Sequence, residues 1–98
     1  MQELLSAEEV DQELGSLDQA WAGSVDSLSR VIEFPGFLDA VRFVDRIAPD
    51  CEAMNHHPDI SISWRTVTLI LRTHSAGGVT AADFALARII DRAVGELI

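Results

Sequence analysis

Basic residues are scarce in this sequence of 98 residues. It has 7 of them against 16 acidic residues, which gives a formal net charge of −9 at pH 7. A protein with this charge balance repels both phosphate backbones and anionic lipid head groups. We therefore expect no direct binding of nucleic acid and no attachment to a membrane.

Cysteine and long apolar runs are also lacking. Cys51 is the single cysteine, so an intramolecular disulfide is excluded. No apolar stretch reaches the roughly 18–20 residues that cross a bilayer, and the acidic start MQELLSAEEV has neither the basic segment nor the apolar run of a signal peptide. These absences favour a cytoplasmic protein.

The composition is that of one small globular domain. An apolar content of 48% with 23% charged residues is ordinary for a soluble protein, and there is no internal repeat or low-complexity segment. We expect a single domain over residues 1–98. A domain of this size buries only roughly 60–68% of the surface that its unfolded chain exposes, which favours self-association.

The N-terminal part predicts a helix and then a hairpin. Ser6 and Glu9 have the spacing of a capping box, so a short helix should follow and end at Gly15 in the left-handed conformation that glycine tolerates. A strand should open at Trp21 and turn through residues 23–27 into a second strand. The second strand should stop at a proline–glycine pair, Pro35-Gly36. Its alternation of apolar residues is interrupted at Arg30.

The middle of the chain predicts a long amphipathic helix. From Phe37 to about Met54 apolar residues recur every three or four positions, which is the pattern of a helix that lies on a core. Pro49 falls inside this pattern and should kink or restart the helix, because proline lacks the amide donor and clashes with the preceding turn. Cys51 lies in the apolar stripe, so we interpret it as a core residue rather than a nucleophile.

Two strands and a final helix should complete the fold. The apolar parity changes between Trp64 and Val67, which requires a bulge or a tight turn at Arg65-Thr66. Thr80 and Asp83 form a second capping box before an apolar helical stripe. Strands in mid-chain, flanked by helices and without regular βαβ alternation, predict an α+β fold whose antiparallel sheet has its helices on one face.

The histidines are the candidates for chemistry. His56, His57 and His74 are all that the chain contains, and imidazole is the side chain best suited to move protons near neutral pH. Two adjacent histidines before Pro58, at a junction of helix and strand, should be exposed, although solvated or core histidines remain an alternative.

A metal site is a second interpretation of the same histidines. They could share a metal with Glu52 or Asp83. Adjacent histidines project in divergent directions, and the sequence has neither an H-x-x-x-H pair nor a CxxC pair. We therefore predict no metal.

The spacing of these residues resembles a known signature. Glu52 is followed after three residues by His56-His57-Pro58, after five by Trp64, after nine by His74 and after eight by Asp83. This resembles the signature of the pterin-4a-carbinolamine dehydratases, the family also known as the dimerisation cofactor of a homeodomain transcription factor. Similar residues extend the resemblance over nearly the whole chain, at Trp21, Ile32, Phe34, Phe37, Ala40, Thr73, Gly78, Leu86 and Ala87.

The resemblance implies a fold and an activity. The fold is a four-stranded antiparallel sheet with three helices packed on one face, in the order α-β-β-α-β-β-α. The activity is elimination of water from 4a-hydroxytetrahydropterin to give quinonoid dihydropterin, in recycling of the tetrahydrobiopterin cofactor, without a metal or a separate cofactor. By position, His56 and His74 would be the acid and base pair, and His57 would mainly bind and orient the pterin.

Further residues take substrate-binding roles by the same resemblance. Glu52 lies one helical turn before His56, so both can lie on one face, where Glu52 would orient a histidine or bind the pterin; a solvated carboxylate is the alternative. Asp83 is a candidate too, although its place in the capping box is a sufficient structural reason for it. Thr73 should face away from His74 and reach substrate only through its backbone.

The remaining candidates shape the pocket or depart from the family pattern. Pro58 and Trp64 would form pocket wall, with core packing as the alternative for Trp64. Asn55, also a substrate-binding candidate, stands where an acidic residue often precedes the two histidines. Arg72 stands where a small hydroxyl residue is common, and it shares a strand face with His74, so a permanent positive charge lies near the site.

A second class of function is compatible with the same fold. Relatives of this family act as transcriptional coactivators or assembly chaperones, and a fold does not decide a function. A non-catalytic interaction protein is therefore the alternative, with a protein partner in place of the pterin. The family also implies a homodimer or homotetramer. An interaction protein has no physical need for all three histidines, which favours the enzyme.

Overall fold

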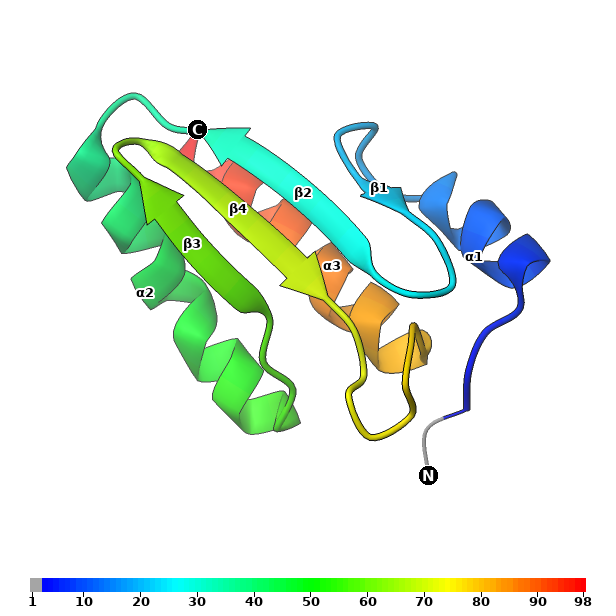
Figure 1. Cartoon of the computed structure of the whole chain (residues 1–98). Helices are drawn as coiled ribbons and strands as arrows, with labels where there is room; N and C mark the ends of the chain where they lie inside the picture. The colour runs from blue at the N-terminus through cyan, green and yellow to red at the C-terminus, as the bar shows by residue number, and fades with distance from the viewer. Residues whose placement is uncertain (1–2) are drawn as a thin grey trace.

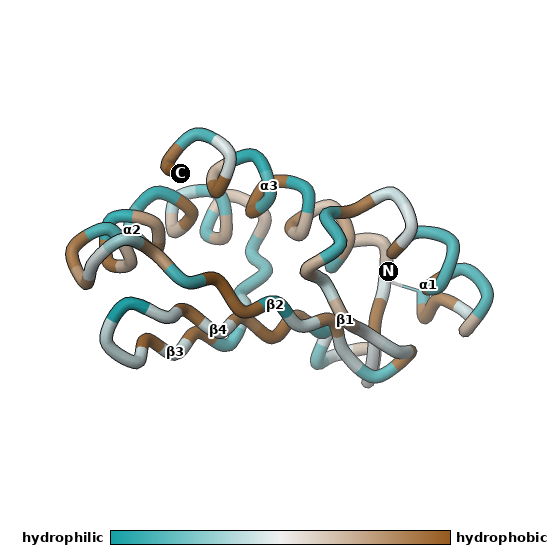
Figure 2. Tube along the Cα trace, turned by 90° about the horizontal axis from the view of Figure 1, so that it is seen from above, coloured by the Kyte–Doolittle hydropathy of each residue, from teal (hydrophilic) through white to brown (hydrophobic). Residues whose placement is uncertain are grey.

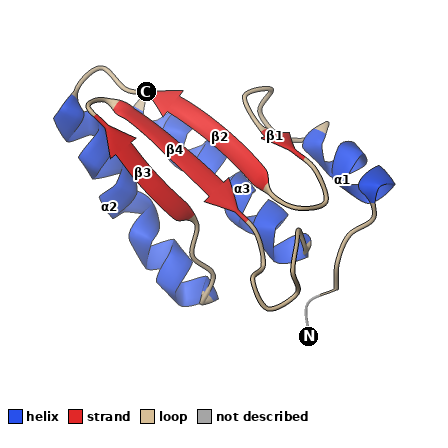
Figure 3. Ribbon diagram, viewed as in Figure 1, coloured by secondary structure: helices blue, strands red, loops and turns tan. Residues whose placement is uncertain are grey.

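The computed structural model describes residues 3–98 and contains three helices and four strands (Figure 1). The order α-β-β-α-β-β-α and the α+β class are confirmed (Figure 3). The elements are α1 (Ala7–Leu14), β1 (Ala22–Gly23), β2 (Leu28–Glu33), α2 (Phe37–Met54), β3 (Asp59–Ser63), β4 (Thr66–Leu71) and α3 (Ala81–Leu97).

The four strands form one antiparallel sheet in the order β1-β2-β4-β3. The long helices α2 and α3 cover one face of this sheet, whereas α1 lies beyond β1 (Figure 2). The opposite face stays open and carries the side chains of the alternate parity. Among the described residues, no helix has both the length and the apolar character needed to cross a membrane.

The core lies between the sheet and the two long helices. Its largest fully buried side chains include Phe34, Phe43 and Phe84, and the rings of Phe34 and Phe43 have centroids 5.1 Å apart. Burying an aromatic side chain of this kind contributes about 1.5–3 kcal/mol. The same core holds α2 and α3 in place, and these two helices supply one end each to the histidine site.

Helix α2 is one continuous helix and does not restart at Pro49. Eighteen residues are continuous from Phe37 to Met54 with Pro49 inside. Proline removes one backbone hydrogen bond, but Pro49 lies on the exposed side, and buried residues hold the helix on both sides of it. Cys51 is one of these buried residues, as expected for a core position.

The helix ends follow the capping boxes, with one difference. Both boxes are formed, at Ser6 with Glu9 and at Thr80 with Asp83. Gly15 does cap α1, but in a right-handed conformation, with φ −62° and ψ −20°. The left-handed cap that we expected is therefore wrong, since the backbone at Gly15 continues the helical twist for one more residue.

The β3–β4 connection is a tight turn of two residues. Ser63 pairs with Thr66, so the turn is Trp64-Arg65, one residue earlier than expected. Trp64 has φ +52°, a left-handed conformation that two-residue hairpin turns need because it matches the twist of the strands. The turn projects Trp64 into solvent, where its side chain is 71% exposed. Trp64 is thus neither core nor pocket wall.

Arg30 interrupts the strand pattern because it belongs to a polar cluster on the covered face. Its side chain is buried with the apolar residues of β2, and its Nη1 atom forms an ion pair with Asp91 of α3. Asp91 also accepts a hydrogen bond of 2.6 Å from the indole nitrogen of Trp21. The carboxylate of Asp91 therefore links the β1–β2 hairpin to α3. It also supplies the counter-charge that a buried arginine requires.

Candidate functional site

The C-terminal end of α2 places the two adjacent histidines. Asn55 caps the helix in the left-handed conformation (φ 49°, ψ 43°), and the His56 amide then donates to the Cys51 carbonyl over 3.0 Å. Asparagine tolerates this conformation better than most residues. The cap turns the chain away from the helix axis, so His56 starts the segment that leads into β3.

The loop between β4 and α3 places the third histidine. The Thr73 amide donates to the Gly78 carbonyl over 2.9 Å, and the Thr73 carbonyl accepts from Ala76 and Gly77. Gly77 has φ +81°, a conformation that glycine adopts without strain. His74 is exposed at the start of this turn. Both polar backbone groups of Thr73 serve the loop, so neither is free for a substrate.

A buried hydrogen-bond network joins the two segments. Asp83 is fully buried, and its Oδ1 atom lies 2.6 Å from Nε2 of His56. The other oxygen of Asp83 accepts from the Thr73 hydroxyl and from the Thr80 amide, each over 2.9 Å. The Thr80 hydroxyl lies 2.7 Å from that of Thr73. The segments that follow α2 and β4 therefore meet the start of α3 on one carboxylate.

The directions of these hydrogen bonds follow from one another. The Ala82 amide donates to the Thr80 hydroxyl, and the Thr73 hydroxyl donates to Asp83. The Thr80 hydroxyl must then donate to Thr73. The ionised carboxylate of Asp83 has no proton to donate, so it accepts at both oxygens. Nε2 of His56 is therefore the donor to Oδ1 and carries a proton. Its Nδ1 atom is the nitrogen that remains for proton exchange, and the His56 side chain is 12% exposed.

Glu52 contacts His57 rather than His56. Its Oε2 atom lies 3.2 Å from Nε2 of His57, and both side chains are more than half exposed. The helical spacing that would align Glu52 with His56 ends at Asn55, because the left-handed cap interrupts the helix. Glu52 is thus placed to orient a histidine, one of its two expected roles, on the exposed side of the site.

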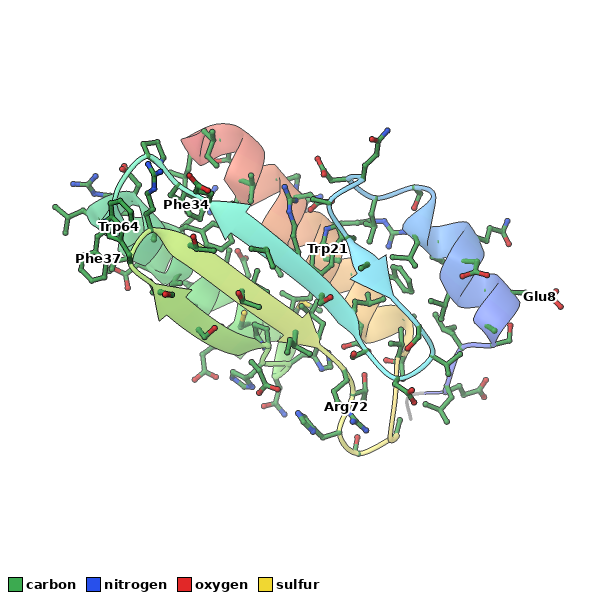
Figure 4. All side chains as sticks on the ribbon, turned by 45° about the horizontal axis from the view of Figure 1, so that its top comes forward. Glu8, Trp21, Phe34, Phe37, Trp64 and Arg72 are labelled. Carbon is green, nitrogen blue, oxygen red and sulfur yellow. The ribbon has the colours of Figure 1, made fainter. Side chains whose placement is uncertain are left out.

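All three histidines lie at one end of the sheet. This end is formed by the last turn of α2, the start of β3, the end of β4 and the first turn of α3 (Figure 1). Pro58 is half-buried in the same segment. Trp64 lies at the opposite end of the β3–β4 hairpin, as Figure 4 shows. The signature residues therefore divide into three histidines at one end of the sheet and an exposed tryptophan at the other (Figure 1).

Sequence reasoning missed the buried hydroxyl of Thr73. It does face away from His74, as expected, but into the interior, where it meets Asp83. Strand parity puts Thr73 on the same face as Leu69 and Leu71, which are fully buried. A hydroxyl at a core position needs a buried partner, and this was the signal that could have found the network.

The three histidines lie outside two surface cavities of the molecule. These cavities measure about 230 and 250 Å³, and no histidine lines either of them. Within residues 3–98, no group of three or more histidine, cysteine or acidic side chains has a geometry that could hold a metal ion. The arrangement of hydrogen bonds suits proton transfer by imidazole.

The structure is that of a small antiparallel α+β protein with a histidine held by a buried carboxylate. Comparison with known proteins shows the family to which it belongs. The sequence model described as Pterin 4 alpha carbinolamine dehydratase matches residues 3–93. Relatives that carry this family's name include one from Mycobacteroides abscessus, 47% identical over 93 residues (95% of this chain and 98% of that protein). Another, from Nocardia farcinica, is 49% identical over 89 residues (91% and 93%). The chain belongs to the pterin-4-alpha-carbinolamine dehydratase family.

Two solved structures are similar to this fold. A transcriptional coactivator/pterin dehydratase from Brucella melitensis superposes with a TM-score of 0.86 at 30% identity, over 91% of this chain and 96% of that one. A pterin dehydratase-like RuBisCO assembly factor of the alpha-carboxysome gives 0.62 at 24% identity, over 76% and 87%. The second likeness is one of fold alone.

Proposed function

We propose that this protein is a 4a-hydroxytetrahydropterin dehydratase that eliminates water to give quinonoid dihydropterin. The observation that carries the proposal is the hydrogen bond from Nε2 of His56 to the buried carboxylate of Asp83. A carboxylate in this position fixes the tautomer and the orientation of the imidazole. The expectation that both adjacent histidines are exposed is wrong for His56, whose side chain is 12% exposed. A histidine that exchanges protons through Nδ1 needs its ring held in this way.

The elimination breaks the C4a–O bond and the N5–H bond of the pterin and forms a C4a=N5 double bond. A base must take the proton from N5, and an acid must protonate the departing hydroxyl so that it leaves as water. We assign these two roles to His56 and His74, one on each side of the ring, with the order left open. No electrons enter or leave the pterin, so the step requires no redox cofactor.

The remaining candidates would bind the pterin around this pair. His57, held by Glu52, would orient the ring, and Asn55 and Pro58 would contact it from the segment before β3. Asp83 and Thr73 have no group directed at the substrate, so we assign them positioning roles instead. We propose that the enzyme acts in the cytoplasm, where it would return the pterin cofactor of a hydroxylase for reduction.

The test is the decay of freshly generated 4a-hydroxytetrahydropterin, followed by ultraviolet absorbance. The wild type is compared with His56→Ala, His74→Ala and His57→Ala, and with Ser61→Ala as a control on the exposed face of β3. General acid or base catalysis contributes about 10²–10⁴-fold, so His56→Ala and His74→Ala should each lose that factor in kcat. His57→Ala should mainly raise KM. A folded wild type that does not accelerate the decay would contradict the proposal.

An interaction role is the second candidate, and one surface favours it. Trp64, Phe37 and Leu38 are all at least half exposed, and Figure 4 shows Phe37 and Trp64 close together at the end remote from the histidines. Large exposed apolar side chains that gather in this way are typical of protein interfaces. A variant Trp64→Ala that keeps dehydratase activity but loses binding to a protein partner would separate this role from catalysis.

Self-association is a further part of the proposal. Strand β3 is an edge strand with unpaired backbone groups, which favours a homodimer or homotetramer. Light scattering should give a mass of two or four chains at working concentration. A monomer mass there would contradict it.

A further inference from the structure

Arg72 is an arginine without a carboxylate partner in an acidic chain. Five of the arginines form ion pairs with acidic side chains, at Arg30, Arg42, Arg46, Arg65 and Arg88. Among the described residues, Arg72 pairs with no acidic group, and Glu52 contacts His57 instead. Its Nε atom is buried and has no hydrogen-bond partner, and the same is true of Nε of Arg30, but Arg30 is neutralised by Asp91 and Arg72 has no such counter-charge. A half-buried positive charge without a counter-charge is costly, which favours binding of an anion there.

The bonds to Asp83 place Arg72 beside the site. Strands β3 and β4 pair Asp59 with Ile70. This pairing ends there, and the two chains continue to His56-His57 on one side and to Arg72-Thr73 on the other. His56 and Thr73 both bond to the carboxylate of Asp83, which brings the two segments together. Arg72 and His57 are the chain neighbours of these two residues, so Arg72 lies beside the histidine site.

The chemistry of this position selects an anion. Guanidinium binds carboxylate and phosphate through two parallel hydrogen bonds, and these charge-assisted bonds are the strongest that a side chain forms. The pterin ring is neutral, so it does not supply such a partner. With a net charge of −9, the protein as a whole repels an anionic substrate, and an unpaired arginine at the site offsets that repulsion locally.

We propose that Arg72 forms an anion subsite, and that the substrates of this protein are pterins whose C6 side chain carries an anionic group. This inference rests on the dehydratase function proposed above. His56, His57 and His74 would hold the ring, and Arg72 would hold a phosphate or a carboxylate on the substituent. Arg72 is thus a specificity-determining residue, and a neutral dihydroxypropyl side chain would leave its guanidinium unpaired.

The test is a fluorescence titration with three pterins that cannot dehydrate: neopterin, neopterin 3′-monophosphate and pterin-6-carboxylate. Proteins to compare are the wild type, Arg72→Gln, Arg72→Lys and Arg92→Gln. Arg92 is a matched control, because it too forms no ion pair among the described residues and lies on α3 away from Asp83. Circular dichroism and the melting temperature check that each variant is folded.

The expected result is a preference of wild type for an anionic pterin over neopterin by about 10- to 100-fold, the value of one or two charge-assisted hydrogen bonds. Arg72→Gln should abolish this preference without weakening the binding of neopterin, Arg72→Lys should keep part of it, and Arg92→Gln should keep all of it. A preference for the monophosphate alone would identify the bound group as phosphate, and a preference for both anions would show that Arg72 binds either group. Equal affinity of wild type for all three pterins, or a preference that survives in Arg72→Gln, would overturn the proposal.

Dehydration of the neutral 4a-hydroxy-6-methyltetrahydropterin distinguishes this inference from the proposed function. Wild type and the control Arg92→Gln should both accelerate that reaction, because no anion is involved. If they do and the titration shows no preference, the dehydratase stands and the anion subsite is wrong. If the titration shows the preference and neither protein accelerates the reaction, the anion subsite stands and the dehydratase is wrong.

Discussion

Substitution of Asp83 by asparagine tests the buried network at its centre. The change keeps the shape of the side chain but replaces an ionised acceptor by a neutral amide. In the wild type, three donors converge on the carboxylate, from His56, Thr73 and the Thr80 amide. The carbonyl oxygen of asparagine can keep the two threonine donors, but its NH₂ group then faces Nε2 of His56. His56 must therefore lose its proton at Nε2 and carry it at Nδ1.

The magnitude follows from the number of charge-assisted bonds. A hydrogen bond to a charged group contributes about 1.5–3 kcal/mol and a neutral one about 0.5–1.5 kcal/mol, so three bonds weakened by about 1 kcal/mol each give a loss of about 3 kcal/mol. Burial of a neutral amide is less costly than burial of a carboxylate, which reduces the net loss to about 2 kcal/mol. In a domain of this size that lowers the melting temperature by roughly 8–16 °C.

Two assays measure the loss of stability and the loss of catalysis separately. Urea unfolding measures the free energy, with Asp59→Asn as a control at an exposed carboxylate on β3. The dehydration assay measures the effect of the exchanged tautomer, for which we expect a loss of about 10²–10⁴-fold in kcat. Thr73→Val removes one bond and leaves the carboxylate on His56, so it should lose stability with a smaller loss of kcat than Asp83→Asn. If Asp83→Asn had the stability and the kcat of the wild type, the reasoning would be refuted.

Three further predictions concern the scaffold. Asp91→Asn should destabilise the fold by about 2–4 kcal/mol in urea unfolding, because it removes the nearer counter-charge of the buried Arg30 and leaves only Asp18, at 3.8 Å; a change under about 0.5 kcal/mol would contradict this. Burial raises the pKa of the Cys51 thiol above its ordinary value of 9.0, with a smaller contribution from Asp50. The unfolded chain then ionises first, so the stability of wild type should fall as pH rises past 9.0, and Cys51→Ala should remove part of that slope. Hydrogen bonds from Ser6, its amide first, lower the pKa of Glu9 below its ordinary value of 4.5, so the stability that they contribute is present above pH 4.5 and is lost as pH falls through the lowered pKa. Glu9→Gln should lack this acid-dependent component in helix content followed by circular dichroism, and an unchanged acid titration would contradict it.

Local sequence determined the helices and the set of reactive side chains. The capping boxes at Ser6 and Thr80 begin α1 and α3 because their bonds join residues only three positions apart. The apolar stripe of α2 is likewise a property of consecutive turns, and it continued through Pro49 because one missing amide is a small loss beside a buried face. The two adjacent histidines and His74 were apparent from residue type alone.

The tertiary structure decided which of these residues work together. His56 meets Asp83 across 27 positions of sequence, and Arg30 meets Asp91 across 61. Neither pairing has a local signal, since each depends on how α2 and α3 lie on the sheet. Glu52 likewise contacts His57 and not His56, because the left-handed residue Asn55 ends the helix between them. Trp64 belongs to the two-residue turn, so it lies at the end of the β3–β4 hairpin that is far from the histidines. Hydrogen bonds within a helical turn follow from spacing, whereas bonds between elements follow from packing, and packing minimises the free energy of the whole chain rather than of any one segment.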